Sequence, residues 1–446
     1  MRQVAAGSRG GGSGEATDAE TGPPPAAPRP AAPRPAAPRP TALRPVHDAL
    51  GATLTGFAGW LMPLRYGSET AEHNAVRQAA GIFDLSHMGQ IGVRGPQAAE
   101  ALDFALTGNL SRLAVGRARY TMMCAPDGGV MDDLIVYRLG AGERAGEAPG
   151  EAAGGGAGGD GARYPAEFLV VANAANADVV EEALRERAHG YDAEITGSPV
   201  AGDEGTAGER ALIAVQGPNA ATIVGRLTGA PLADLKYYAS VGTSVATGDA
   251  EVPVLLARTG YTGEDGFELF CRPGDAVAVW QALTGAGKGD GLIPAGLSAR
   301  DTLRLEAGMP LYGNELGRDV TPFEAGLGRV VKFDKQGDFV GRDALAASAG
   351  ERPARTLIGL EGRSRRVPRH GYPVLLDGQP CGSVTSGAPS PTLGRPIAMA
   401  YVDTPAADAI TAAAAPGPAA GGLAVDIRGR AEPADYVKLP FYHRAT

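Results

Sequence analysis

Runs of glycine, alanine and proline divide this chain into segments that can fold and segments that cannot. Residues 1–43 begin with glycine and serine and then repeat Ala-Ala-Pro-Arg-Pro three times between Ala26 and Pro40. Proline fixes φ and removes a backbone donor, so this segment is predicted to be an extended tail with few internal contacts. The tail is either solvated or a docking arm for a partner that binds proline. Residues 140–161 are predicted to be a flexible glycine-rich loop, and residues 406–422 a further loop.

The rest of the 446 residues is long enough for two or three domains. Short predicted strands, such as 134–137 and 168–172, alternate with predicted helices, such as 178–188 and 299–306. After about residue 352 the pattern changes to short segments separated by turn signals. That change predicts a small, mostly β domain at the C-terminal end.

Charge and cysteine content exclude several classes of protein. The chain carries 41 basic and 50 acidic residues, a net charge of −9, which argues against a nucleic-acid-binding protein. Its three cysteines are far apart, which argues against a structural zinc site or a disulfide framework and favours the cytoplasm. The sequence has no apolar run of about 18 residues, so no membrane helix is predicted. A match to a dinucleotide-binding motif at 154–159 lies in the glycine-rich loop, with no strand leading into it.

Two adjacent acids follow a predicted hairpin turn at 127–129. Strand side chains alternate between faces, so Asp133 is expected to share a face with Ile135 and Tyr137, while Asp132 faces the other way. One of the two carboxylates therefore reaches any given pocket. The alternative is that both acids lie at a solvated strand end.

Other isolated polar residues are also candidates for a site. Glu268 interrupts the apolar run 267–271, where a carboxylate is costly unless it is paired, hydrogen-bonded or on an exposed face. If 299–306 is helical, Arg300 and Arg304 stand one turn apart, and they either clamp a carboxylate or pair with acids of their own helix. His87 is either catalytic or structural, and no histidine lies at metal-ligand spacing from another. These residues alone do not identify a reaction.

Several motifs together resemble the aminomethyltransferase family, the T proteins of the glycine cleavage system. They include Phe-Asp-Leu-Ser-His-Met-Gly, Gly-Val-Met-Asp-Asp-Leu-Ile-Val-Tyr and Arg-Thr-Gly-Tyr-Thr-Gly-Glu-Asp-Gly-Phe-Glu. The matching segments occur in the family's order from about residue 44 to the C-terminus: 59–66, 83–89, 129–137, 171–176, 258–268, 299–307, 311–313 and 385–394.

The resemblance implies an α+β fold, a three-part cloverleaf around a tetrahydrofolate pocket. Two sub-domains would occupy residues 44–350, and a small C-terminal β-barrel would occupy residues 351–446.

The resemblance also implies the reaction. A one-carbon unit passes from the aminomethyl-lipoyl arm of H protein to tetrahydrofolate, which yields 5,10-methylenetetrahydrofolate, ammonia and dihydrolipoyl H protein. The expected protein is a cytoplasmic monomer that needs no metal.

The resemblance also implies residue roles. Asp133 matches the family's catalytic aspartate beside the reacting folate nitrogens. Glu268 matches an acid that hydrogen-bonds the pterin ring, and Arg300 suits the glutamate tail of folate or an anionic partner. Arg258 is expected to support Glu268 electrostatically. The remaining residues expected to bind folate are Met88, Tyr120, Tyr137, Asn173, Tyr237 and Tyr261.

Three other functions remain open at this point. Some relatives bind folate without transferring a group, but the Lys-Gly-Cys-Tyr-type motif of those proteins is absent and the acids at Asp133 and Glu268 are present. A folate-dependent demethylase of the same fold is the second alternative. The third is an interaction scaffold that acts through the proline-rich tail.

Overall fold

The computed structural model describes residues 37–139, 166–197, 210–248, 250–413 and 422–444. The predicted glycine-rich loop and the predicted tail up to residue 36 lie outside this range. The predicted end of the tail at residue 43 is wrong, because Arg39–Pro40 form strand β1 and Leu43 is fully buried. The predicted loop at 406–422 is also wrong in its first half, since helix α9 covers Thr404–Ala413.

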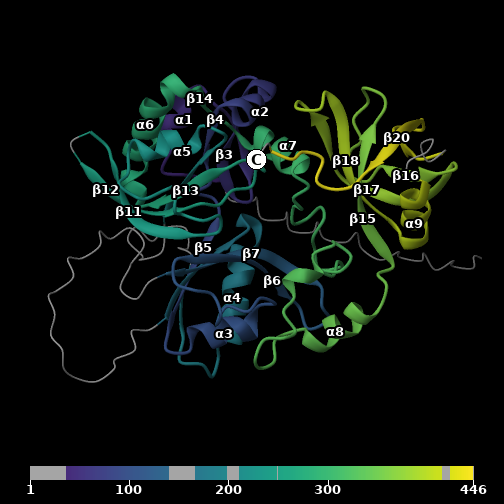
Figure 1. Cartoon of the computed structure of the whole chain (residues 1–446), viewed down its shortest axis with the longest axis horizontal. Coiled ribbons are helices and arrows are strands. Elements are labelled where there is room, and N and C mark those ends of the chain that lie inside the picture. Colours follow the sequence, from purple (N-terminus) through teal and green to yellow (C-terminus); the bar gives the residue numbers. More distant parts are fainter. Residues whose placement is uncertain (1–36, 140–165, 198–209, 249, 414–421, 445–446) are drawn as a thin grey trace, which may run out of the picture. The chain divides into compact units, whose positions relative to one another are not determined.

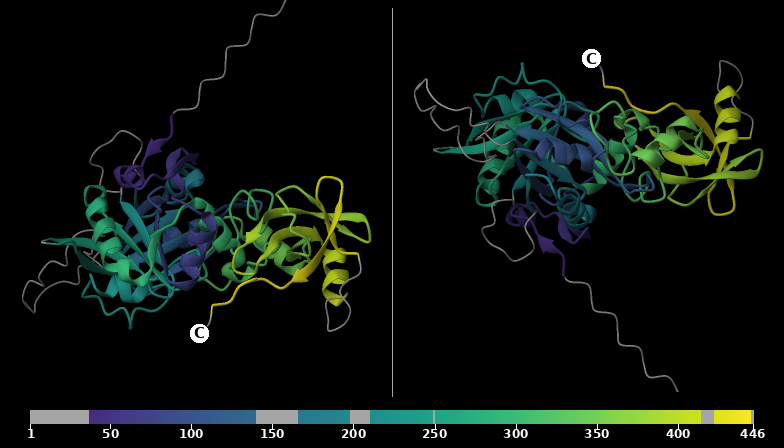
Figure 2. Two further views of the ribbon diagram at one scale, coloured as in Figure 1. Left: turned by 90° about the horizontal axis from the view of Figure 1, so that it is seen from above. Right: turned by 90° about the horizontal axis from the view of Figure 1, so that it is seen from below.

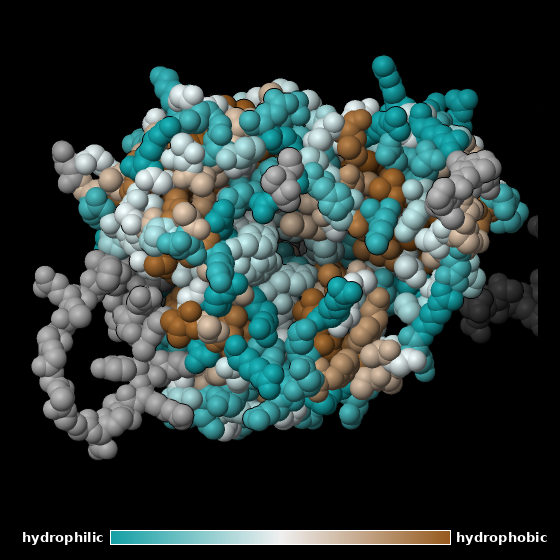
Figure 3. Space-filling model, in the orientation of Figure 1, coloured by the Kyte–Doolittle hydropathy of each residue, from teal (hydrophilic) through white to brown (hydrophobic). Residues whose placement is uncertain are grey.

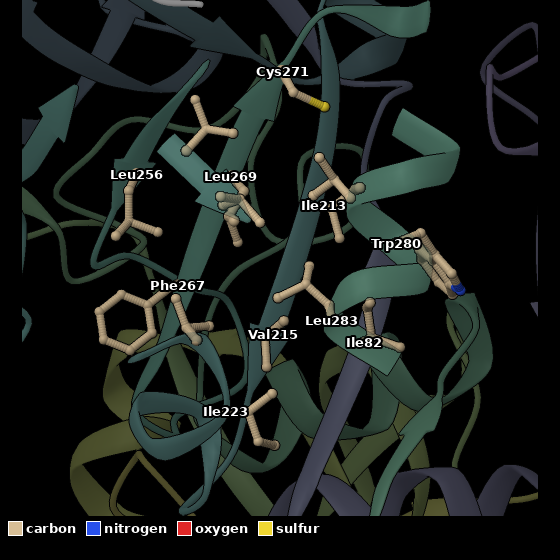
Figure 4. Packing of buried hydrophobic residues seen from close by; sticks show 14 of the residues in the cluster. Ile82, Ile213, Val215, Ile223, Leu256, Phe267, Leu269, Cys271, Trp280 and Leu283 are labelled. Atoms are coloured by element: carbon tan, nitrogen blue, oxygen red, sulfur yellow. The ribbon is translucent and has the colours of Figure 1, made fainter. Parts of the chain in front are cut away.

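A six-stranded sheet has the order β11-β12-β13-β10-β4-β14. Helices α5 and α6 cover one face, where Ile213 and Leu269 pack against Trp280 (Figure 4). Burying such side chains is the main favourable contribution to folding. The elements are β4 (Ala80–Asp84), β10 (Ala211–Gln216), β11 (Ser240–Ala246), β12 (Glu251–Ala257), β13 (Gly266–Cys271), β14 (Leu292–Pro294), α5 (Ala220–Gly225) and α6 (Ala276–Gly287).

A five-stranded sheet has the order β6-β7-β8-β5-β9. Helices α3 and α4 cover its outer face, where Val136 and Phe168 pack with Leu102 and Leu184. The strands predicted at 134–137 and 168–172 and the helix predicted at 178–188 are confirmed here. The elements are β5 (Gly89–Gly95), β6 (Arg117–Cys124), β7 (Val130–Leu139), β8 (Ala166–Ala172), β9 (Glu194–Thr196), α3 (Ala98–Ala105) and α4 (Ala177–Arg187).

The inner faces of the two sheets pack against each other. Tyr137 and Leu169 from the five-stranded sheet share a buried cluster with Leu212 and Phe270 from the six-stranded sheet. Alternation along each strand places Glu268 on the same inner face as Phe270, opposite Leu269, which faces the helices. Any polar side chain on an inner face therefore lies between two sheets.

The third part is a closed barrel of six strands beside the two sheets (Figures 1 and 2). It confirms the predicted C-terminal barrel. Helix α9 packs on it through Ala407 and Ile410, and α8 (Arg342–Gly350) precedes it. The strands are β15 (Arg355–Gly362), β16 (Pro373–Leu376), β17 (Gln379–Ser390), β18 (Arg395–Asp403), β19 (Ala424–Asp426) and β20 (Ala431–Val437).

A small N-terminal sheet, order β1-β3-β2, completes the fold. Its hairpin turns at Ala58 and Gly59, both with positive φ, as a tight two-residue turn requires. The remaining elements are α1 (Arg44–Ala49), β2 (Thr53–Phe57), β3 (Trp60–Arg65), α2 (Glu69–Gln78), α7 (Leu297–Glu306) and 3-10 turns at Ala174–Asn176, Pro273–Asp275, Lys288–Asp290 and Gly328–Val330. No helix in the described part of the chain is long and apolar enough to cross a membrane.

One buried carboxylate joins α2, α7 and the barrel. Glu306, at the end of α7, lies 2.9 Å from the guanidinium of Arg77 and 3.1 Å from the ring of His73, both on α2. It also accepts hydrogen bonds from Ser390 Oγ at the end of β17 (2.5 Å) and from Thr392 Oγ1 (2.7 Å). Burial opposes the charge, but the hydrogen bonds and the His73 imidazole lower the pKa of Glu306 to about 2.

Candidate active site

A cavity of about 790 Å³ lies where the two sheets, the β2–β3 hairpin, α7 and the segment 308–327 meet. Figure 3 shows a hollow near the centre of this face. Its size is that of a pocket for a drug-sized molecule. Lining residues include Phe57, His87, Met88, Tyr120, Asp133, Asn173, Tyr238, Tyr261, Glu268 and Arg300.

Asp133 lines the cavity from the inner face of β7, as the alternation predicted. Tyr120 donates its hydroxyl to one carboxylate oxygen (3.1 Å), and Asn173 donates its amide to the other (2.8 Å). Burial raises the pKa of Asp133, and these two hydrogen bonds oppose the rise. The carboxylate is therefore held in one orientation.

Asp132 points away from the cavity but is fully buried, so the solvated strand end is excluded. It accepts hydrogen bonds from the backbone N–H (3.0 Å) and the side-chain amide (2.9 Å) of Asn173, and from the amide of Asn176 (2.7 Å). Burial and the neighbouring charge of Asp133 raise the pKa of Asp132 to about 7. The Asn173 amide thus contacts two adjacent carboxylates.

Glu268 lies on the inner face of β13 and is 8% exposed, so it does not occupy an exposed strand face. It accepts hydrogen bonds from Tyr137 Oη (3.2 Å) and from the hydroxyl of Thr259. Burial raises the pKa of Glu268, and the Thr259 hydrogen bond, the positive charge of Arg300 and the Tyr137 hydrogen bond oppose the rise. Its place in an apolar run is explained by these partners.

The two arginines of α7 have different surroundings. Arg304 is buried and pairs with Asp301 (2.8 Å) and Glu315 (3.0 Å), so it is not half of a free clamp. The guanidinium of Arg300 lies 4.7 Å from the centre of the Tyr261 ring, and no carboxylate of the described residues lies within ion-pair distance. Tyr261 lines the cavity and donates its hydroxyl to a backbone carbonyl.

Three residues expected at the site do not line the cavity. Tyr137 is fully buried and donates its hydroxyl to Glu268. Tyr237 is 45% exposed and is not part of the cavity wall, whereas Tyr238 is. Tyr238 lies in a turn and has a left-handed backbone (φ 58°). Arg258 forms an ion pair with Asp265 (2.6 Å) instead of supporting Glu268.

The sequence reasoning left other site residues without a role. Thr259 and Asn176 complete the hydrogen bonding of Glu268 and Asp132, and nothing local in the sequence marks them. His87 is expected from the sequence to be either catalytic or structural. It lines the cavity next to Met88, and its adjacency to that expected folate contact is the signal that was available.

Comparisons with known proteins bear on this arrangement. The chain matches the GCVT N-terminal domain family over residues 43–144 and 162–335, and the glycine cleavage T-protein C-terminal barrel domain family over 355–443. It is 59% identical to the aminomethyltransferase of Streptomyces coelicolor over 401 residues, 89% of this chain and 96% of that protein. It is 43% identical to the aminomethyltransferase of Moorella thermoacetica over 398 residues, 89% and 96% of the two chains.

A solved structure of an aminomethyltransferase is also similar to this chain. The glycine cleavage system aminomethyltransferase T from Bartonella henselae superposes with a TM-score of 0.74 at 32% identity. The match covers 91% of this chain and 99% of that one.

Proposed function

Because the chain belongs to the aminomethyltransferase family, the T proteins of the glycine cleavage system, we propose that the aminomethyl-lipoyl arm of H protein and tetrahydrofolate react in the cavity between its two sheets. Its activity is that of an aminomethyltransferase. The observation that carries the proposed site is Asp133, a buried carboxylate whose two oxygens are each oriented by a neutral donor at the cavity wall.

The reaction requires protons to move in a defined way. A methylene group forms bonds to two folate nitrogens, N5 and N10, and each nitrogen loses one proton. The carbon–sulfur and carbon–nitrogen bonds of the aminomethyl-lipoyl group break, and the thiol and the ammonia take up one proton each. A carboxylate at Asp133 would relay a proton and stabilise the positive charge that develops on the transferred carbon.

The other cavity residues would bind the folate. Glu268 would hydrogen-bond the pterin ring, and Arg300 would attract an anionic group. Apolar and aromatic walls with a few oriented polar groups are typical of a small-molecule pocket, and this cavity combines both. Met88, Tyr120, Tyr137, Asn173 and Tyr261 would pack against the ligand or orient the two acids.

The test is tetrahydrofolate-dependent release of ammonia from aminomethylated, lipoylated H protein by the purified chain. Release that requires folate and yields methylenetetrahydrofolate is the expected result. Tight folate binding without release would contradict the proposal and identify a folate-binding relative without transferase activity. One-carbon transfer to tetrahydrofolate from an N-methyl amine, and not from H protein, would favour the demethylase alternative, so the assay includes a panel of N-methyl amines.

We also propose a division into residues 44–350 and 351–446, a monomer, and the cytoplasm as the compartment. The first barrel strand begins at Arg355, which supports the division. All three cysteines are unpaired and two are buried, which suits a reducing compartment.

Deleting residues 1–36, and not 1–43, separates an enzyme from a scaffold that acts through its tail. The shorter deletion spares Leu43, and an enzyme should keep its turnover.

A further inference from the structure

His87 is a buried histidine with no hydrogen-bond partner among the described residues. It is 3% exposed and lines the cavity from the turn between β4 and β5. Its Nδ1 is closed off from open space without a partner among the described residues. Its Nε2 also makes no hydrogen bond there and is not closed off, and the ring of Phe57 lies edge-on at 5.5 Å. An unpartnered buried nitrogen is uncommon in a folded protein, and Nε2, the nitrogen that is not closed off, is the one that a ligand in the cavity can reach.

The protonation of the ring follows from its surroundings. Burial and the positive charge of Arg300 lower the pKa of His87 to about 4, so the imidazole is neutral near pH 7. A neutral imidazole has one N–H and one bare nitrogen. Because a sealed N–H without an acceptor is the rarer and costlier arrangement, the proton belongs on Nε2. His87 then presents a donor to the cavity.

The charge beside His87 narrows the choice of ligand group. Arg300 lines the same cavity, and its guanidinium has no ion-pair partner among the described residues. An amine or ammonium end of the lipoyl arm would meet an N–H donor and a positive charge. A carbonyl or carboxylate oxygen would accept from both. Tetrahydrofolate carries such oxygens on its pterin ring and on its benzoylglutamate half.

We propose that the Nε2–H of His87, together with Arg300, binds a carbonyl or carboxylate oxygen of tetrahydrofolate. The inference rests on the proposed function and adds to it a folate-binding residue that acts as a neutral donor. The ring of Phe57 packs against the His87 ring as an edge-to-face contact, and the charge of Arg300 acts on Glu268 as well as on His87.

Two substitutions test the donor. His87→Leu keeps the volume and removes the N–H, whereas His87→Gln places an amide N–H near the position of Nε2. We expect the dissociation constant of 5-formyltetrahydrofolate, a stable probe, to rise about 5- to 20-fold in His87→Leu and less than about 3-fold in His87→Gln. In turnover assays the KM for tetrahydrofolate should rise more than kcat falls. His189→Gln, at an exposed histidine, is the matched control.

A fragment distinguishes the two sources of the oxygen. If His87 binds the pterin carbonyl, a tetrahydropterin without the benzoylglutamate half should bind His87→Leu more weakly than wild type. If His87 binds a carbonyl or carboxylate of the benzoylglutamate half, the fragment should bind wild type and His87→Leu equally while the whole folate does not. Either pattern supports the inference.

Nuclear magnetic resonance of the wild-type protein tests the protonation and the contact of His87 directly, without a substitution that could prevent folding. The imidazole ¹⁵N shifts of His87 should show the Nε2–H form, and the Nε2 signal should move when 5-formyltetrahydrofolate binds. Unmoved shifts, or equal folate affinity in wild type and a folded His87→Leu, would overturn the inference alone. Failure of the wild type to bind the probe would overturn the proposed function as well.

Discussion

Each of the two sheets contributes one acid to the cavity wall, and the surroundings of the two acids differ. Asp133, on β7, has a second carboxylate as its neighbour in the chain, and both acids share the Asn173 amide. Glu268, on β13, has the guanidinium of Arg300 close enough to oppose the rise in pKa that burial causes. Each acid accepts hydrogen bonds from two neutral donors, so satisfaction of the carboxylate is common to both sites. The charge next to it is what differs.

That difference assigns separate tasks to the two acids. Burial raises the pKa of Asp133 and hydrogen bonds oppose the rise, so this carboxylate binds a proton more readily than an exposed one, which suits proton transfer. At Glu268 the guanidinium of Arg300 favours the charged form against burial, which suits a fixed hydrogen bond to a ligand. We therefore expect substitutions at the first acid to reduce kcat and at the second to reduce folate affinity.

The largest effect is expected for Asp133→Asn. The amide is nearly isosteric but neither accepts a proton nor carries charge, so kcat should fall by about 100-fold or more. The dissociation constant for folate should change by less than about 3-fold. Turnover and equilibrium binding of 5-formyltetrahydrofolate measure the two. Wild-type turnover in this variant would remove the catalytic role. Asp127→Asn, at the hairpin turn, is the control.

Glu268→Gln should show the opposite division. Loss of a charge-assisted hydrogen bond to the pterin is expected to raise the dissociation constant for folate by about 10- to 100-fold. At saturating folate, kcat should fall much less than in Asp133→Asn. The comparison between the two sheets fails if both variants reduce kcat and affinity in the same proportion.

Asp132→Asn should be milder than Asp133→Asn but not neutral. The strand points Asp132 away from the cavity, yet it holds Asn173, which orients Asp133. We expect kcat to fall about 10-fold, with folate affinity retained. A double-mutant cycle with Asn173→Ala should show that the two losses are not additive. Damage equal to that of Asp133→Asn would contradict the assignment of the two faces.

The smallest effect is a pH slope in stability. With a folded pKa of about 7 and an unfolded value near 3.9, Asp132 binds more protons in the folded state between those values. The free energy of unfolding should therefore fall as pH rises from about 4 to about 7, by less than about 1.4 kcal/mol per pH unit, and level off above 7. Urea unfolding of wild type and Asp132→Asn measures this contribution as a difference in slope.

The same experiment has an internal control of opposite sign. The folded pKa of Glu306 is about 2, below its unfolded value, so its contribution is present above about pH 4.3 and is lost as pH falls toward 2. Glu306→Gln should remove that acid-side slope and leave the one between pH 4 and 7. An unchanged slope in Asp132→Asn would mean that its carboxyl group titrates normally.

Local pattern in the sequence predicted some features of the site and missed others. Strand alternation predicted which of Asp132 and Asp133 faces the cavity, and the cost of a carboxylate in an apolar run marked Glu268. The family resemblance, not the pattern, supplied the reaction and the barrel. Hydrogen bonds between distant segments, such as the one from Tyr137 to Glu268, could not be predicted, because a sequence gives no distances between strands. The ion pair of Arg258 with Asp265 is local by comparison, yet alternation alone does not choose between Asp265 and Glu268.

Backbone conformation accounts for the remaining differences. Tyr238, and not Tyr237, lines the cavity from a turn in which Tyr238 has a left-handed backbone, and a tyrosine carries no signal for that conformation. The tail was predicted to end too late, because a proline-rich composition continues into residues that pair with β3 and pack in the core.

The buried Glu306 cluster makes the barrel and the two sheets a single cooperative unit. Its carboxylate is neutralised by partners from α2 and completed by hydroxyls beside the barrel, so pulling the barrel away would expose an incomplete ion pair in an apolar interface. Such an opening costs several kcal/mol and brings the free energy of local opening close to that of global unfolding. Amide hydrogens in α7 and in β17 should then exchange with solvent together. A substitution that loosens the barrel should also shift the part of the cavity wall that α7 forms.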